Sequence, residues 1–168
     1  FLPIVFALYW FISNKRTKLQ NILLLIASYI FYGWWDWRFL SLILFSSFVD
    51  YNVGLGLEKV SSSAKRKALL LCSIVVNIGF LGVFKYYNFF AESFSDAFTI
   101  IGQPIEVSRL NIILPVGISF YTFQTLSYSI DVYRKKMPPT KDAIAFFAFV
   151  GFFPQLVAGP IERASNLL

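Results

Sequence analysis

Residues 114–161 begin LPVGISFYTFQTLSYSIDVYRKK and end FFPQLVAGPI, a stretch that is apolar enough to lie in a membrane. It nevertheless carries polar side chains and helix-breaking residues that contact with lipid alone does not require. Polar groups at membrane depth are expensive and usually mark a pathway or a site. This stretch is therefore the predicted functional region, with candidate residues Tyr121, Gln124, Tyr128, Asp131, Pro154 and Gln155.

The composition of the whole chain predicts the same environment. Of its 168 residues, 57% are hydrophobic, 20% are aromatic and only 14% are charged, and the mean hydropathy is +0.65. Soluble domains are about 45–50% apolar and about 25% charged. A soluble core of this size cannot hide so much apolar surface, so the sequence predicts an all-α, multi-pass membrane protein.

The net charge of +6 does not indicate a nucleic-acid surface, because the cations lie in short clusters between apolar runs. The clusters fall in the loops 13–18, 58–67 and 134–142, whereas loops 36–38 and 85–111 are neutral or slightly acidic. Short loops rich in Lys and Arg stay in the cytoplasm. We therefore expect a plasma-membrane protein, the bacterial inner membrane in a bacterium, with these three loops inside and the Phe1 end outside.

The apolar runs predict five or six membrane segments in one helical domain that covers residues 1–168. The first run precedes any cation and begins without Met, so we expect residues 1–12 to be the tail of a transmembrane helix that starts earlier. The expected architecture is one helical membrane domain, or the N-terminal portion of a larger one. The expected segments are 1–12, 19–35, 39–57, 68–84, 111–133 and 143–158.

A polar stripe follows the fifth expected segment. With about 100° per residue, Gly117, Tyr121, Gln124, Tyr128 and Asp131 fall within an arc of about 80° on one helix face. Such a stripe either faces the bundle interior or a water-filled cavity, or serves to hydrogen-bond neighbouring helices. For Asp131, an ion pair with the following Arg134 is the simpler explanation.

The last expected segment is interrupted. Residues 143–153 would span only about 16 Å, too little to cross a bilayer, before Pro154 and the pair Gly159–Pro160. A half-helix followed by irregular backbone requires shielding by protein or a cavity. We expect a re-entrant or Pro-broken segment, with Gln155 at the break, able to bond freed backbone groups or a ligand; a simple proline kink is the alternative.

Other candidate groups are few. Asp50 lies inside the third segment, where a function, a partner cation or a position near the boundary would explain it, and Lys85 is expected to reach the outer interface. Cys72 is the one cysteine and the chain has no histidine. We therefore predict no metal site, no bound cofactor and no catalytic residue within these 168 residues.

Several strings resemble the membrane-bound O-acyltransferase family, in particular the bacterial branch whose membrane subunits O-acetylate alginate and other exported polysaccharides. The likeness covers nearly the whole chain in order. The matching strings are residues 114–124, 131–134 and 152–161, together with 31–34 and 84–89.

The resemblance implies a funnel through the membrane, lined in part by the six candidate residues. It implies transfer of an acyl group, expected to be acetyl, from a cytoplasmic-side donor (acetyl-CoA or a carrier-linked acyl group) to a hydroxyl of an exported polysaccharide or of an acyl-relay envelope protein. The family's catalytic histidine lies C-terminal to the matched region, so we expect this stretch alone to be inactive.

Two other classes of function fit part of the pattern. Polar stripes and discontinuous helices also occur at transporter sites, so a transporter or channel subunit is one alternative. A non-catalytic membrane scaffold is the other. The family strings favour the acyltransferase, because composition and periodicity alone predict only a helical membrane protein with a polar passage.

Overall fold

The fold is all-helical. A computed structural model describes residues 1–12, 16–102, 117–159 and 164, and within these ranges it contains helices and no strand. This confirms the predicted all-α class. In chain order the helices are α1 (Leu2–Phe11), α2 (Thr17–Trp35), α3 (Trp37–Lys59), α4 (Ser63–Leu81), a π-helical turn (Gly82–Tyr86), α5 (Tyr87–Ile100), α6 (Ile118–Tyr133), α7 (Ala143–Gly151) and α8 (Phe153–Ala158).

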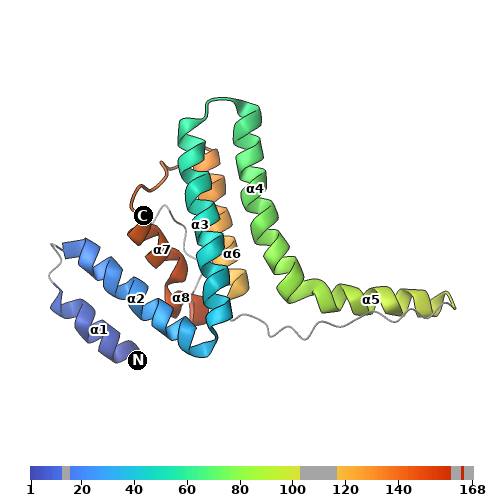
Figure 1. The fold of residues 1–168 in the computed structure, drawn as a ribbon, viewed down its shortest axis with the longest axis horizontal. Helices are drawn as coiled ribbons and strands as arrows, with labels where there is room; N and C mark the ends of the chain where they lie inside the picture. Colours follow the sequence, from blue (N-terminus) through green and yellow to red (C-terminus); the bar gives the residue numbers. More distant parts are fainter. Residues whose placement is uncertain (13–15, 103–116, 160–163, 165–168) are drawn as a thin grey trace.

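Helix α3 lies at the centre of the bundle. It packs against α2, α4, α6 and α7, while α4 also packs against α6 and α2 against α7 (Figure 1). Asp36 alone separates α2 from α3, and its carboxylate caps α3 by accepting a hydrogen bond from the Arg38 N–H at 2.8 Å. The second and third expected segments therefore form an antiparallel pair joined by a single capping residue.

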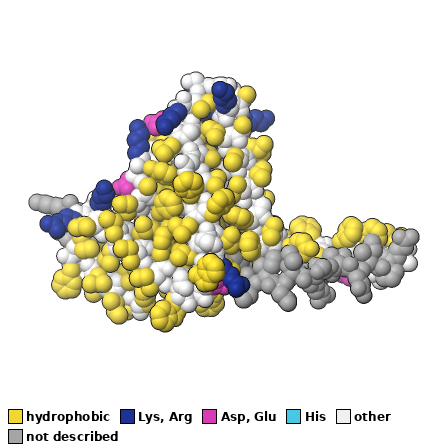
Figure 2. Space-filling view, in the orientation of Figure 1, with side chains coloured by type: hydrophobic (Ala, Val, Ile, Leu, Met, Phe, Trp, Pro, Cys, Tyr) yellow, Lys and Arg dark blue, Asp and Glu magenta, His cyan; other side chains and the backbone are white. Residues whose placement is uncertain are grey.

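Two helical runs of the described part are long and apolar enough to cross a membrane, Trp37–Lys59 and the continuous run Ser63–Ile100. Figure 2 shows hydrophobic side chains over the middle of the bundle, with Lys and Arg mostly toward the end where α3 joins α4 and beside the start of α2. Large apolar side chains such as Trp34 (91% exposed) face outward. These features suggest a membrane protein, and the count of five or six spans stays a prediction.

Two of the basic loops meet at one end of the bundle. The Arg66 guanidinium donates to the backbone carbonyls of Leu57 and Tyr133, and Lys141 Nζ lies 3.3 Å from Glu58 Oε1. Loops 58–67 and 134–142 are therefore neighbours. Near the opposite end, the exposed Lys85 donates from Nζ to Ser119 Oγ at 2.9 Å, and its place at the outer interface stays a prediction.

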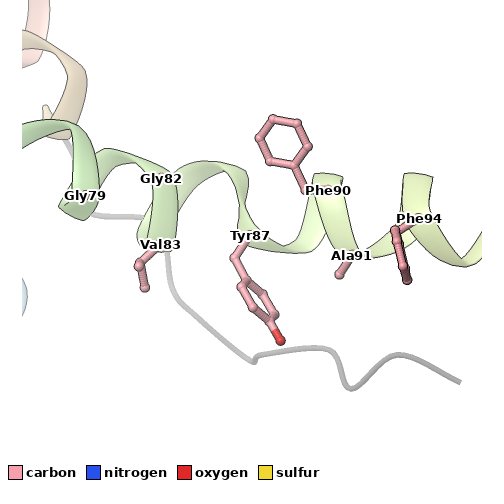
Figure 3. A pocket seen from close by; sticks show the side chains of 7 residues that line it. All are labelled: Gly79, Gly82, Val83, Tyr87, Phe90, Ala91 and Phe94. Carbon is pink, nitrogen blue, oxygen red and sulfur yellow. The ribbon is translucent and has the colours of Figure 1, made fainter. Parts of the chain in front are cut away.

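The fourth helix is longer than expected. It begins at Ser63, passes through the π-helical turn and continues as α5, which points away from the bundle (Figure 1). A hollow of about 480 Å³ lies along this bend, lined by small and aromatic residues: Gly79, Gly82, Val83, Tyr87, Phe90, Ala91 and Phe94 (Figure 3). The part of the expected loop 85–111 that the structure describes is therefore helical as far as Ile100.

The fifth expected segment starts later than the hydrophobic pattern indicated. Gly117 has φ of +78° and precedes α6, so it is not on the helical stripe, and residues 111–116 lie outside the described part. A Cβ at Gly117 would also come within 3.1 Å of Leu156. Because only glycine tolerates both the left-handed backbone and this close approach, Gly117 sets the start of α6.

A glycine also sets how closely α3 approaches α6. A Cβ built on Gly54 would lie 2.5 Å from the Tyr128 hydroxyl, and Tyr128 itself is fully buried. The tyrosine ring therefore occupies the space that any other residue at position 54 would need. This contact fixes the separation of the two helices.

Gly54→Ala is expected to destabilise the fold by about 1–3 kcal/mol, because the added methyl group displaces the Tyr128 ring in a packed core. The measurement is the thermal unfolding midpoint of the purified intact protein in detergent. Gly79→Ala is the matched control, since nothing lies within 4 Å of a Cβ there. The control should raise the midpoint, as alanine is the better helix former; an equal response of both variants would contradict this packing argument.

Candidate functional site

The break between α7 and α8 lies at Phe152, which has φ of −59° and ψ of 102°. The interruption expected at Pro154 is therefore present and lies two residues before it. Pro154 lies in the first turn of α8, where a missing N–H costs little because no helical acceptor is available to it. The proline therefore starts the second half-helix and does not kink the first.

Side chains from two other helices bond the backbone groups that the break leaves without helical partners. In a continuous helix the Phe153 N–H would donate to the Phe149 carbonyl. Instead, Gln124 Nε2 of α6 donates to the Phe149 carbonyl at 2.9 Å, and the Phe153 N–H donates to Ser28 Oγ of α2 at 3.3 Å. The break is thus satisfied by protein, as irregular backbone in a membrane requires.

Gln155 lies beside this arrangement and does not bond the Phe149 carbonyl itself. Its side-chain oxygen is 3.5 Å from Gln124 Nε2, at the limit of a hydrogen bond, and the residue is 7% exposed. Gln124 thus bonds one freed backbone carbonyl, and the expectation that Gln155 bonds freed backbone groups or a ligand stays a prediction. The two glutamines that the sequence singled out in separate segments nevertheless meet at the break.

The polar stripe of α6 faces the bundle interior. Tyr121, Gln124 and Tyr128 are at most 1% exposed and Asp131 is 9% exposed. Tyr128 has a structural partner, since its hydroxyl accepts a hydrogen bond from the Thr140 N–H at 3.3 Å.

Asp131 makes no ion pair with Arg134 within the described ranges, where Arg134 is exposed at the helix end. The ion-pair explanation of Asp131 was therefore wrong.

Three buried tyrosine hydroxyls have no hydrogen-bond partner in the part of the chain that the structure describes. They belong to Tyr29 and Tyr32 of α2 and to Tyr121 of α6, and the side chains of Tyr32 and Tyr121 lie close enough to interact electrostatically. A buried hydroxyl without a partner costs about 1–3 kcal/mol. Such groups in a native fold call for an explanation, and a functional role is one.

A second polar cluster joins α3, α4 and α6 around Asp50, which is fully buried. Its carboxylate accepts hydrogen bonds from Ser73 Oγ, from Asn77 Nδ2 at 2.7 Å and from Ser129 Oγ at 3.1 Å. Thr125 Oγ1 in turn donates to Asn77 Oδ1 at 3.0 Å. Within the described residues no cation contacts Asp50, so a partner cation does not explain it, while a position near the boundary stays a prediction.

Sequence reasoning singled out Asp50 but not its partners. Ser73 and Asn77 are four residues apart on α4, and Thr125 and Ser129 are four apart on α6, so each pair lies on one helix face. That spacing was the available signal. It was overlooked because small polar residues are common in membrane bundles and do not stand out singly.

The described residues hold no group of three or more His, Cys, Asp or Glu side chains that could bind a metal ion. Cys72 is a free, exposed thiol on α4. The site chemistry within these ranges therefore consists of amides, hydroxyls and single carboxylates. These groups can bind and orient a substrate by hydrogen bonds.

Comparison with curated proteins shows that the chain is related, over its whole length, to bacterial O-acetyltransferases. It is 43% identical over 172 aligned positions to a protein of Pseudomonas aeruginosa named probable alginate O-acetylase AlgI, an alignment that covers 100% of the chain and 32% of that protein. A protein of the same name from Pseudomonas syringae pv. tomato is 44% identical, with 99% of the chain and 32% of the relative covered. This confirms the resemblance predicted from the sequence strings.

A more distant relative carries a different acceptor in its name. The peptidoglycan O-acetyltransferase of Helicobacter pylori is 29% identical, over 100% of the chain and 36% of its own length. The chain thus spans about a third of the length of these curated relatives. No family model matches the chain, and no solved structure matches it.

Removal of one partner should show that the Asp50 cluster stabilises the bundle. Ser129→Ala is expected to lower the free energy of unfolding by about 1.5–3 kcal/mol, because it deletes a hydrogen bond to a buried carboxylate. Ser41→Ala is the matched control: Ser41 is exposed and bonds only the Arg38 carbonyl of its own helix. The control should stay within about 0.5 kcal/mol. Equal unfolding midpoints for both variants would mean that the cluster contributes nothing to stability.

Proposed function

We propose that the parent protein is a membrane O-acyltransferase that moves an acetyl group onto hydroxyls of an exported polysaccharide. The observation that carries this proposal is the 43–44% identity to two named alginate O-acetylases across essentially the entire chain. The peptidoglycan O-acetyltransferase among the relatives supports the reaction more than the acceptor, since its name gives a different polymer.

The proposed chemistry is a balanced acyl transfer. The acceptor hydroxyl oxygen attacks the acyl carbonyl carbon, a new ester bond forms, the bond to the donor breaks, and the hydroxyl proton passes to a base. Acetyl-CoA or a carrier-linked acyl group would serve as the donor. A histidine suits the role of base near neutral pH, and since these 168 residues contain none, we place the base elsewhere in the parent protein.

The proposed orientation puts loops 13–18, 58–67 and 134–142 in the cytoplasm, with five or six membrane segments in the bacterial inner membrane. Loops 58–67 and 134–142 meet at one end of the bundle through Arg66 and Lys141, which supports a common side for both. The charge distribution supports the cytoplasm as that side. An acyl group from a cytoplasmic donor would then have to pass along the bundle to an exported polysaccharide or an envelope relay protein.

The residues that meet at the α7–α8 break are proposed to line part of this passage. The free hydroxyls of Tyr32 and Tyr121 are buried donors without a protein partner in the described part, and a substrate oxygen would supply one. Gln124 and Gln155 hold the half-helices beside them. A dry, protein-lined site also protects an activated acyl group from hydrolysis.

Deletion of the gene for the intact protein is expected to remove ester-linked acetate from the exported polysaccharide, measured after alkaline release. The intact protein supplied in trans should restore the acetate, whereas residues 1–168 alone should not, because they lack a histidine base. Unchanged acetate content after deletion, in cells that export the polymer, would overturn the proposed function.

Tyr121→Phe separates a substrate-binding hydroxyl from a packing group. Because this hydroxyl has no described protein partner, the variant should unfold at the same or a higher temperature, while acetyl transfer falls roughly two- to tenfold, the equivalent of one hydrogen bond. Tyr128→Phe is the control; it removes the acceptor of the Thr140 N–H and should lower the unfolding temperature. Full transfer activity in Tyr121→Phe would exclude Tyr121 from the passage.

A further inference from the structure

A hollow of about 300 Å³ lies at the end of the bundle where the two basic loops meet. It is distinct from the α7–α8 break and from the Asp50 cluster. Its walls come from the end of α3, the start of α4, the end of α6 and the segment that follows α6. The lining residues are Leu57, Glu58, Arg66, Val132, Lys135, Lys136, Met137, Pro138 and Pro139.

The charge of this hollow is positive. Arg66, Lys135 and Lys136 face one acid, Glu58, and the Glu58 carboxylate is already paired with Lys141 at 3.3 Å. Within the described ranges, no ion pair involves Lys135 or Lys136. Two exposed ammonium groups beside a guanidinium thus remain available to a ligand that carries negative charge.

Arg66 is held in place by the protein. Its two terminal nitrogens donate to the backbone carbonyls of Leu57 and, at 2.8 Å, Tyr133, and its guanidinium carbon lies 5.6 Å from the centre of the Tyr133 ring. These carbonyls end α3 and α6 and carry the negative ends of the helix dipoles. By bonding them, Arg66 removes the groups that would repel an anion at this end of the bundle.

The outer wall of the hollow is also anchored. The Thr140 N–H donates to the Tyr128 hydroxyl at 3.3 Å, and the Tyr51 hydroxyl donates to the Lys141 carbonyl at 2.9 Å. Between these anchors and the end of α6, Pro138 and Pro139 restrict the backbone. The hollow therefore exists before a ligand binds, which lowers the entropy that binding must overcome.

The backbone at Lys135 is a second, independent indication. Its φ of 59° is the one positive value at a non-glycine residue in the described part of the chain. The Lys135 N–H bonds the Val132 carbonyl and the Lys136 N–H bonds the Asp131 carbonyl, which is the helix ending that glycine normally provides. A lysine in this strained position is explained if its ammonium group binds a ligand in the hollow, since backbone strain of this kind is concentrated at functional sites.

We propose that this hollow binds a phosphate group at the membrane surface. The ends of membrane helices and their basic loops lie at the level of the lipid headgroups, and basic pockets between such helices suit phosphate-bearing headgroups. Ammonium groups together with a fixed guanidinium make strong, charge-assisted hydrogen bonds to phosphate oxygens. The phosphate can come from an anionic phospholipid or from a soluble anion, and binding does not depend on the proposed transfer reaction.

The test uses the intact protein in detergent, with native mass spectrometry to count bound lipid when phosphatidylglycerol or phosphatidylcholine is added. Lys135→Gly is the informative variant, because it removes the ammonium group while placing the preferred residue at the positive φ. It should keep or raise the unfolding temperature and weaken phosphatidylglycerol retention about fivefold, the contribution of one lysine near an anionic surface. Lys135→Gly combined with Lys136→Ala should weaken it roughly 20-fold.

The double variant Lys65→Ala and Lys67→Ala is the matched control, since it removes equal charge from exposed positions that do not line the hollow. Because these two lysines do not line the hollow, the control should keep phosphatidylglycerol retention within about twofold of the unchanged protein, far less than the loss expected for Lys135→Gly combined with Lys136→Ala. Calorimetric titration with inorganic phosphate distinguishes the two sources of phosphate. If inorganic phosphate binds and this binding is lost in Lys135→Gly, the ligand is a soluble anion. If phosphatidylglycerol is retained but inorganic phosphate does not bind, the ligand is a lipid headgroup. The proposal would be overturned if the Lys135/Lys136 double variant and the Lys65/Lys67 double variant lost phosphatidylglycerol retention equally, or if neither lost any.

Discussion

The buried carboxylate of Asp50 constrains the whole bundle, because it needs donors from two other helices at the same height. Ser73 and Asn77 come from α4 and Ser129 from α6, and the three helices can satisfy the carboxylate only in one register. A buried carboxylate that lost these bonds would carry a large desolvation cost. The contact of Gly54 with Tyr128 lies one turn further along α3 and depends on the same register.

This register connects the two ends of the molecule. It brings the end of α6 beside the ends of α3 and α4, where Arg66 bonds carbonyls of both α3 and α6. It also presents Gln124 to the broken segment, so that the Phe149 carbonyl is bonded from α6. The interrupted α7–α8 segment and the basic hollow are therefore both supported by one three-helix core.

The sequence predicted the helical class, the relationship to O-acyltransferases and the inward face of α6, because hydrophobic periodicity and the family strings report these directly. It could not predict the partners of Asp50 or the Gln124–Phe149 bond, which join residues 23 to 79 positions apart. The sequence pattern also misplaced helix boundaries, because these depend on contacts between residues that are distant in the chain. The start of α6 at Gly117, the break at Phe152 and the left-handed Lys135 follow from contacts that a pattern of residue types does not contain.

The bond from the Phe153 N–H to Ser28 joins residues 125 positions apart, and it has a consequence for the order of assembly. Until α2 and α6 are both in place, the α7–α8 segment has no external partners for its interrupted backbone. Both helices precede this segment in the chain, so the broken form depends on partners that are synthesised before it.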